Sequence, residues 1–295
     1  MTNLLFYLNF WSRYFLKLFP NHIPKPNEFS ANDINYYCKL DSEFSIQNGV
    51  RLNEVNLLKN SGYSYDIYKI IYPFHRSLRF NYLPGDITHI PPEPTFLKSR
   101  PICQGNNNSV LLPLDSRRHL RFANDKLEFD QKKEGVVWRG AAYQESRQLF
   151  LRTCSRYKFV NLGNTAISKG EVIEFAKPKM TIREQLKYRF IVSIEGNDVA
   201  TNLKWIMSSN SVCMMPKPKF ETWYKEGTLI PGVHYIELKD DFSDLELQYN
   251  RYRQDPISCI RIAKKANEYA NLFKIPSLNL LLARCVASKY FKNLK

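Results

Sequence analysis

The segment FIVSIEGNDVATNLKWIMSSNSVCMM, residues 190–215, constrains the fold of this chain more than any other part of its sequence. An apolar run at residues 190–194 predicts a buried strand, a helical pattern follows over residues 199–208, and a second apolar run at residues 211–215 predicts another strand. Asn197 is a suitable N-cap for the helix between them. A strand, a turn, a helix and a strand in this order indicate a parallel βαβ unit.

The turn of this unit is a candidate phosphate-binding position. A helix N-terminus at the carboxyl edge of a parallel sheet offers free N–H groups and a positive dipole end to a diphosphate. Gly196 lets the backbone approach a ligand closely, and Thr201 and Asn202 offer hydrogen bonds to ribose or phosphate. Asp198 in the first helical turn either stabilises the helix dipole or contacts sugar hydroxyls. The turn has neither GxGxxG spacing nor a Walker lysine.

Strands and helices also alternate on the N-terminal side of this unit. The sequence predicts a strand at residues 136–138, a helix over residues 145–154, a strand at residues 158–161 and a helical stretch at residues 182–187. Such alternation is typical of a doubly wound α/β unit.

A length of 295 residues suits two compact domains, each with its own core. We place the boundary just before the strand at 136–138. This divides the chain into residues 1–130, residues 131–275, and a C-terminal helix over residues 276–295 that is expected to pack back on the first domain.

The first domain gives weaker signals than the second. Its best strand candidate is residues 68–72, after a helix-like stretch at residues 52–59. Residues 83–101 contain a proline every few positions and predict a long irregular connection.

Three helices are expected at the end of the chain. Ser243 is a plausible N-cap for the first and Ser277 for the third, while Pro256 suits the first turn of the second.

The charge balance bears on partners. Forty-three Lys and Arg against 28 Asp and Glu give a net charge of +15, which favours polyanions or an anionic membrane face. The basic residues do not follow zinc-finger or RNA-binding patterns, so we expect no nucleic-acid partner. One concentration, Arg117, Arg118, His119 and Arg121, either receives a phosphorylated glycan or is a solvated surface cluster.

Cysteine usage and the N-terminus bear on location. The six cysteines are widely spaced without a CxxC pair, and no secretory signal precedes them, so we expect reduced thiols in a cytoplasmic protein. Residues 1–20 are rich in Leu and aromatic residues at helical spacing. Their uninterrupted apolar run is too short to span a bilayer. They form either a helix on the inner face of the cytoplasmic membrane or one packed on the core.

Four motifs together carry a resemblance to a known family. KYRFIVSIEGNDVATNLKW, SSNSVCMMP and ETWYKEGTLIPGVHYIELKDDFSDL closely resemble the signature of glycosyltransferase family 90, and WRGAAYQESR resembles its aromatic-Arg-Gly turn followed by Arg. The resemblance covers roughly residues 83–244. The family includes lipopolysaccharide-modifying enzymes of bacteria, capsule-associated proteins of fungi and protein O-glucosyltransferases of animals.

The resemblance implies an α/β fold of the GT-B type, with two Rossmann-like domains facing an inter-domain cleft. The C-terminal domain would hold a nucleotide-sugar, expected to be a UDP-sugar, and the first domain would be on the acceptor side. It further implies inverting transfer without a metal or other cofactor, here to a hydroxyl of lipopolysaccharide or another bacterial surface glycan. Two alternatives stay open: a protein O-glycosyltransferase, and a non-catalytic polyanion-binding or glycan-binding protein on the same fold.

The resemblance also suggests catalytic residues. The family arginine that neutralises the leaving diphosphate matches Arg147, whose guanidinium suits two phosphate oxygens. The family's general base is an Asp in the N-terminal domain, and its nearest counterpart is Asp86. The alternatives are that Asp86 only forms a turn after Pro84 and Gly85, or that His75 is the base.

The donor loop departs from the animal pattern, in which two arginines occur where this chain has Glu195 and Asn202. Lys204, Arg139 or backbone amides must then supply more of the diphosphate binding, and the sugar need not be glucose. The residues expected on the donor are Arg139, Gly140, Glu195, Gly196, Asn197, Asp198, Thr201, Asn202 and Lys204.

Asp240, Asp241 and Asp244 allow a metal-binding interpretation, because aspartates hold a divalent cation in other sugar transferases. We favour the simpler account, in which these acids complement the dipole of the helix that follows.

Aromatic residues nearby have similar alternatives. Trp223 and Tyr224 either stack on a base or sugar or, as we favour, pack in the core. His234 is expected to be a packed histidine at a strand edge rather than a catalyst.

Overall fold

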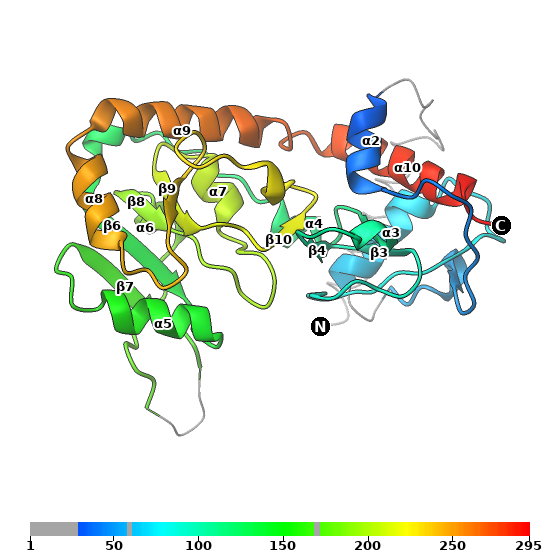
Figure 1. Ribbon diagram of the computed structural model, residues 1–295, viewed down its shortest axis with the longest axis horizontal. Helices are drawn as coiled ribbons and strands as arrows, with labels where there is room; N and C mark the ends of the chain where they lie inside the picture. Colours follow the sequence, from blue (N-terminus) through cyan, green and yellow to red (C-terminus); the bar gives the residue numbers. More distant parts are fainter. Residues whose placement is uncertain (1–28, 58–60, 168–171) are drawn as a thin grey trace, which may run out of the picture.

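The computed structural model describes residues 29–57, 61–167 and 172–295. The helix expected within residues 1–20 lies outside the described residues. Figure 1 shows two groups of elements, one around a five-stranded sheet and one that combines the N-terminal elements with the last helix. Helix α9 (Pro256–Asn271) runs along the first group and leads into α10 (Pro276–Lys292) in the second.

The sheet has the strand order β11-β9-β8-β6-β7, and every pairing in it is parallel. The predicted strands in this half are confirmed with small shifts of their ends, and the mixed α/β class is confirmed with them. The five strands are β6 (Lys133–Gly140), β7 (Val160–Asn164), β8 (Tyr188–Val192), β9 (Val212–Pro216) and β11 (Ile236–Leu238).

Side chains alternate between the two faces of this sheet. In β6, Val136 and Trp138 pack in one hydrophobic core, while Val137 packs in the other. Strands β8 and β9 alternate in the same way. A sheet buried on both faces explains why its strands are continuous apolar runs in the sequence.

Helices cover both faces. Helices α5 and α8 pack in the core that contains Trp138, α7 packs in the other, and α9 contributes to both. The predicted helix 145–154 is confirmed as α5. The helices of this half are α5 (Glu145–Cys154), α6 (Ile182–Gln185), α7 (Leu203–Met207), α8 (Leu245–Arg253) and α9 (Pro256–Asn271).

Of the predicted starts of the last three helices, only that of α9 is confirmed. Pro256 begins α9 as expected, and the Asp255 side chain caps it by accepting from the backbone N–H of Ser258. The other two caps were wrong. The N-cap of α8 is Asp244 rather than Ser243, and α10 begins at Pro276 without a side-chain cap from Ser277.

The described strands of the N-terminal group are all short. Its described strands form an antiparallel pair, β1 with β2, and a parallel pair, β3 with β5. The described residues therefore do not form a second open sheet in this half, as two Rossmann-like domains would require. The elements are α2 (Ala31–Tyr37), β1 (Val50–Arg51), η2 (Leu52–Glu54), α3 (Ser61–Ile71), β2 (Arg79–Phe80), β3 (Thr95–Leu97), β4 (Ser99–Pro101), η3 (Asn106–Asn108), β5 (Ser109–Leu111), α4 (Ser116–His119) and η4 (Phe129–Gln131).

The strand predicted at residues 68–72 is wrong, because these residues complete helix α3 and the turn after it. Ile67, Ile70, Ile71 and Phe74 are all buried at spacings of three and four residues, which is the helical period. The β-branched and aromatic composition hid this periodicity. The helix-like stretch before α3 contains only the 3₁₀ turn η2 among its described residues.

Contacts at several points join the groups. Strand β4 of the N-terminal half pairs antiparallel with β10 (Phe220–Thr222), just before the 3₁₀ turn η5 (Glu226–Thr228). Beneath this pairing Arg100 is fully buried and contacts Glu221 at 2.7 Å. Residues 83–101 are irregular as expected up to Pro94, and β3 and β4 occupy the rest.

Helix α10 packs on α2 and α3 of the N-terminal group. Tyr290 Oη donates to the Pro94 carbonyl at 3.0 Å, and Lys289 Nζ donates to the Cys38 carbonyl at 2.8 Å. Five of the six cysteines are buried, and all are free thiols. Within residues 29–57, 61–167 and 172–295, no helix combines the length and apolar character needed to cross a membrane.

Candidate functional site

A cavity of about 200 Å³ lies at the carboxyl ends of β8 and β9. Residues 193–196 and 215–220 line it, and Ser146 of α5 lies at its edge. Strand β6 has β7 on one side and β8 on the other, so the order of strands reverses beside this cavity. In open α/β sheets, ligands bind outside the carboxyl ends of the strands at such a reversal.

Arg147 of α5 lies directly at this reversal. Its guanidinium donates to the carbonyls of Ala141 at 3.0 Å and of Ile194 and Glu195 at 3.1 Å each, which ties the end of β6 to the end of β8. Burial and the nearby charge of Arg118 lower the pKa of Arg147. Within the described part of the chain Arg147 has no ion-pair partner, so its positive charge beside the cavity is not neutralised.

Glu195 and Gly196 shape the wall of the cavity. A side chain at Gly196 would meet the Arg147 guanidinium at 3.0 Å, so glycine is required for this close approach. Glu195 Oε1 accepts from the backbone N–H groups of Lys219 and Phe220 at 3.0 and 3.1 Å, which holds the opposite wall. Burial raises the pKa of Glu195 to about 7.

The helix expected to begin directly after Asn197 is wrong. Residues 197–202 form bends and turns, and α7 starts only at Leu203, with Asn202 as its N-cap. Instead of capping a helix, Asn197 donates to Asp86 Oδ2 at 3.1 Å and accepts from Gln144. A donor diphosphate would therefore not meet a helix N-terminus here.

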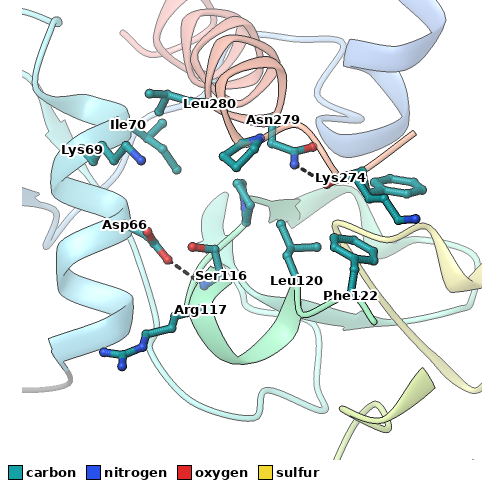
Figure 2. Close-up of a pocket in the computed structure, with 13 residues that line it drawn as sticks. Asp66, Lys69, Ile70, Ser116, Arg117, Leu120, Phe122, Lys274, Asn279 and Leu280 are labelled. Carbon is teal, nitrogen blue, oxygen red and sulfur yellow. Dashed lines mark hydrogen bonds between the residues drawn. The ribbon is translucent and has the colours of Figure 1, made fainter. Parts of the chain in front are cut away.

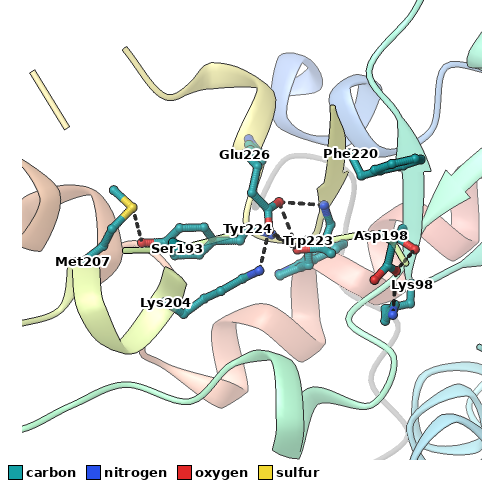
Figure 3. A network of polar contacts seen from close by, with 12 residues as sticks. Lys98, Ser193, Asp198, Lys204, Met207, Phe220, Trp223, Tyr224 and Glu226 are labelled. Carbon is teal, nitrogen blue, oxygen red and sulfur yellow. Dashed lines mark hydrogen bonds and ion pairs between the residues drawn. The ribbon is translucent and has the colours of Figure 1, made fainter. Parts of the chain in front are cut away.

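Asp198 is likewise not in a first helical turn. It is buried and reaches into the N-terminal half, where Lys98 Nζ contacts its Oδ2 at 2.7 Å and Ser99 Oγ donates to the same oxygen (Figure 3). Lys98 also contacts Asp86 Oδ1 at 2.5 Å. Lys98 is fully buried, so one ammonium group holds two carboxylates from the two halves of the chain.

The two carboxylates differ in access to solvent. The side chain of Asp86 is 24% exposed and that of Asp198 only 4%. Burial alone would raise the pKa of Asp86, but the hydrogen bond and charge of Lys98, with the hydrogen bond from Asn197, lower it below its ordinary value. Asp86 is therefore an ionised, reachable carboxylate at neutral pH.

Lys204, expected on the diphosphate, is instead fully buried in an ion pair with Glu226 (Figure 3). Glu226 also accepts from the backbone N–H and the hydroxyl of Thr222. Because the Lys204 ammonium is buried and already paired with Glu226, it is not free to bind a diphosphate in the cavity. Glu226 itself borders the cavity.

Arg139 and Gly140 face β7 rather than the cavity at β8 and β9. The Arg139 guanidinium bonds the backbone carbonyl and side-chain oxygen of Asn161 at 2.9 and 2.8 Å, and the carbonyls of Trp138 and Pro178. A side chain at Gly140 would meet the Trp138 ring at 2.8 Å. These contacts give both residues a structural role at the edge of the sheet.

The remaining two donor candidates lie apart from each other. The Asn202 side chain donates to the Val192 carbonyl and accepts from Ser193 Oγ, each at 3.0 Å, and so fixes the end of β8. Thr201 lines a different cavity, of about 360 Å³, together with Asp115, Arg117, Arg118, Arg121 and Trp205.

The alternative candidates have other partners. His75, the alternative base, is exposed, and its Nδ1 contacts Ser77 Oγ at 2.6 Å. His234 Nδ1 accepts from the Ile230 N–H, and its ring packs on Tyr269, as expected of a packed histidine.

Trp223 and Tyr224 belong to the core, as favoured. Both are buried, and Trp223 stacks on Tyr37 with ring centroids 3.9 Å apart.

The three acids before α8 are engaged locally. Asp240 pairs with Lys219 at 3.0 Å, Asp241 accepts from Ser243, and Asp244 accepts from the Lys239 N–H. Among the described residues, no group of three His, Cys, Asp or Glu side chains is arranged to hold a metal ion.

Sequence reasoning missed three residues of this site: Lys98, Ser99 and Glu226. Lys98 and Ser99 lie in TFLKSRP, where polar residues interrupt a short apolar run. That interruption is the available signal, because charged residues inside a buried strand segment need partners. Nothing local to Glu226 indicated that it pairs with Lys204.

The fold and the site thus define an α/β protein with a ligand cavity at the reversal of its parallel sheet and the Arg147 guanidinium beside it. The sequence profile of glycosyl transferase family 90 matches residues 113–274. The chain is 42% identical to the "O-glucosyltransferase LpsA" of Dichelobacter nodosus over 265 residues, which is 90% of this chain and 83% of that protein. This chain belongs to glycosyl transferase family 90 and is a glycosyltransferase.

A second similarity is narrower. "Uncharacterized protein 179R" of Invertebrate iridescent virus 6 is 30% identical over 107 residues, which is 33% of this chain and 9% of the viral protein.

Proposed function

We propose that this glycosyltransferase transfers a sugar from a UDP-sugar to a hydroxyl of a bacterial lipopolysaccharide or another surface glycan. Glucose is the first sugar to test, because the 42% identical relative is named an O-glucosyltransferase. The observation that carries the proposal is the unneutralised Arg147 beside a cavity at the carboxyl ends of parallel strands. A cation at this point suits a diphosphate.

The donor binds on the sheet half and the acceptor enters from the N-terminal half, which is the division of roles in a GT-B enzyme, although the described residues of the N-terminal half form no second open sheet. This arrangement is supported by the fact that the cavity and the proposed base come from different halves of the chain. The cavity at β8 and β9 belongs to the sheet half, whereas Asp86 comes from the other half and reaches Asn197 at its edge. A sugar bound between them has its reacting carbon near both halves.

Arg147 stabilises the leaving group. Three of its N–H groups are bound to backbone carbonyls, which fixes the guanidinium plane. A guanidinium has five N–H donors, so two remain for phosphate oxygens. Because the group is already oriented, it stabilises the charge that grows on the diphosphate without rearranging.

Asp86 acts as the general base. The acceptor oxygen bonds to the anomeric carbon as the bond from that carbon to the diphosphate breaks, and the hydroxyl proton passes to the Asp86 carboxylate. UDP leaves with the bonding electron pair, and attack opposite to it inverts the anomeric centre. The lowered pKa of Asp86 keeps it ionised, although it also makes Asp86 a weaker base.

We extend the proposal to transfer without a metal ion, with Arg147 supplying the charge that a divalent cation supplies in other transferases. We also infer a cytoplasmic location, at most peripheral on an anionic membrane face, for which the net charge of +15 and the free thiols are the support. Retention of transferase activity in EDTA would support transfer without a metal ion, and loss of activity would contradict it.

The test is transfer of labelled glucose from UDP-glucose to bacterial core oligosaccharide, compared with a folded polypeptide acceptor. We expect labelling of the oligosaccharide, reduced about 10³-fold in kcat by Asp86→Asn with little change in KM for the donor. Asp41→Asn, an exposed carboxylate of the same half, is the matched control. Labelling of the polypeptide alone would replace the glycan acceptor by a protein, and full activity of Asp86→Asn would remove Asp86 as the base.

A further inference from the structure

The cavity that contains Thr201 is unusually basic. Arg117, Arg118 and Arg121 line it, against one carboxylate, Asp115. Three guanidinium charges and one carboxylate leave two positive charges around a space of about 360 Å³. Trp205, which is buried in the core, closes one side of the cavity.

The arginines are available for a ligand. Arg118 approaches Asp115 at 3.7 Å, but its side chain is 57% exposed. Arg117 and Arg121 form no hydrogen bond or ion pair with any of the described residues. Like charges this close repel one another, so an anion is the natural counterpart of the cluster.

Helix α4 contains two of these arginines, Arg117 and Arg118, and its first residue is held in place by a buried hydrogen bond. The buried carboxylate of Asp66 accepts from the Ser116 N–H at 2.7 Å, and Figure 2 shows Arg117 extending away from this contact. Beneath the cluster His119 is buried, and its pKa is lowered to about 2 by burial and by the charges of Lys204, Lys98 and Arg118. His119 is therefore uncharged at neutral pH and adds no charge to the cluster.

The cavity is distinct from the one at β8 and β9 but close to the proposed chemistry. The two cavities share no lining residue. Arg118 nevertheless contributes to lowering the pKa of Asp86 and of Arg147, so it lies within electrostatic range of both. Thr201 of this cavity also lies three residues after Asp198, which shares Lys98 with Asp86. An acceptor whose hydroxyl reaches Asp86 can therefore place a neighbouring substituent among the arginines.

We propose that the acceptor is a phosphorylated sugar whose phosphate binds Arg117, Arg118 and Arg121, with the Thr201 hydroxyl as a further donor. This inference rests on the proposed function and names the chemical class of its acceptor. A phosphate monoester has nearly two negative charges and three strong acceptor oxygens, which matches three guanidinium groups better than a single carboxylate does.

The test measures binding of mannose 6-phosphate by ligand-observed NMR in the presence of saturating UDP, with mannose as the uncharged counterpart and inorganic phosphate as a third probe. We expect mannose 6-phosphate to bind more tightly than either, with an affinity that falls as salt is raised. Arg117→Gln/Arg121→Gln should weaken it by about tenfold or more, since two charge-assisted contacts are lost.

Arg251→Gln/Arg261→Gln is the control, because it removes the same net charge from the outer surfaces of α8 and α9 and should leave binding unchanged. Weaker binding of mannose 6-phosphate with saturating UDP than without UDP, or loss of UDP binding in Arg117→Gln/Arg121→Gln, would assign the arginines to the donor and overturn the proposal. Unchanged binding in that variant, or inorganic phosphate binding as well as the sugar phosphate, would overturn it too. Failure of the wild type to bind UDP would instead contradict the proposed function.

Discussion

At the scale of single residues, Lys98 links the two halves of the chain through charge. It contacts Asp86 from the N-terminal half and Asp198 from the sheet half, and all three are wholly or largely buried. Removing charges from water is costly, so such a cluster is maintained only when each charge has a partner. The arrangement leaves Asp86 with one oxygen on Lys98 and the other on Asn197.

Asn197→Ala tests the electrostatic state of Asp86. Loss of this hydrogen bond should raise the pKa of Asp86, and with it the acid limb of the pH profile of kcat/KM, by about half a unit to one unit. Gln144→Ala is the control, because it removes the bond to Asn197 but leaves the one from Asn197 to Asp86. An acid limb that stays in place in both variants would show that Asp86 does not control the rate.

Glu195 makes a prediction about stability and pH. Its pKa rises from about 4.5 in the unfolded chain to about 7 in the fold, so the folded state binds more protons between these values. The stabilising contribution of Glu195 is therefore complete below about pH 4.5 and is lost as the pH rises through about 7, by on the order of 3 kcal/mol. Glu195→Gln should remove this dependence.

Urea unfolding at pH 5 and pH 8 measures the effect. The free energy of unfolding of Glu195→Gln relative to wild type should increase between the two pH values. An equal difference between variant and wild type at both pH values would mean that Glu195 titrates normally.

Local sequence predicted some of these residues but not their partners. The strand ends indicated Glu195 and Gly196, because the carboxyl edge of a parallel sheet is where such turns gather, whereas Arg147 was suggested by the family resemblance. Lys204 was misplaced, since its partner Glu226 lies 22 residues away and no local pattern marks the pair. The link from Asp86 to Lys98 and Asp198 spans both halves and had no local signal.

At the scale of elements, apolar runs located the strands of the central sheet because each strand is buried on both faces. Errors arose where tertiary contacts override local preference. Helix α7 is shorter than the pattern over 199–208, because Asp198 is held by Lys98 in the other half and the chain bends to reach it. In α3, packing against α10 favours the helix despite its strand-like composition.

The pairing of β4 with β10 depends on the buried contact between Arg100 and Glu221. Glu221→Gln should lower the free energy of unfolding by about 3 kcal/mol, because it leaves the fully buried Arg100 without a countercharge. Chemical denaturation measures this loss. Glu268→Gln, in the exposed pair with Lys265, should change the free energy of unfolding far less. Similar losses in the two variants would contradict a structural role for the buried pair.

At the scale of the whole molecule, the two halves are not independent units. One hydrophobic core includes Phe80 and Phe96 of the N-terminal half together with Ile191 of the sheet and Val286 of α10. The sequence could indicate the sheet half, whose signals are local, but not this shared core, which depends on contacts between distant segments. The same continuity brings Asp86 to the edge of the cavity on the sheet half.

The most direct test of the central claim is calorimetric titration of the protein with UDP, with and without magnesium, repeated on Arg147→Ala. Arg152→Ala, an exposed position on the same helix, is the control, and thermal unfolding shows that each variant is folded. We predict that UDP binds without magnesium and that Arg147→Ala weakens binding by about tenfold or more while Arg152→Ala does not. Absence of UDP binding, or equal affinity in Arg147→Ala, would contradict a diphosphate site at the reversal of the sheet.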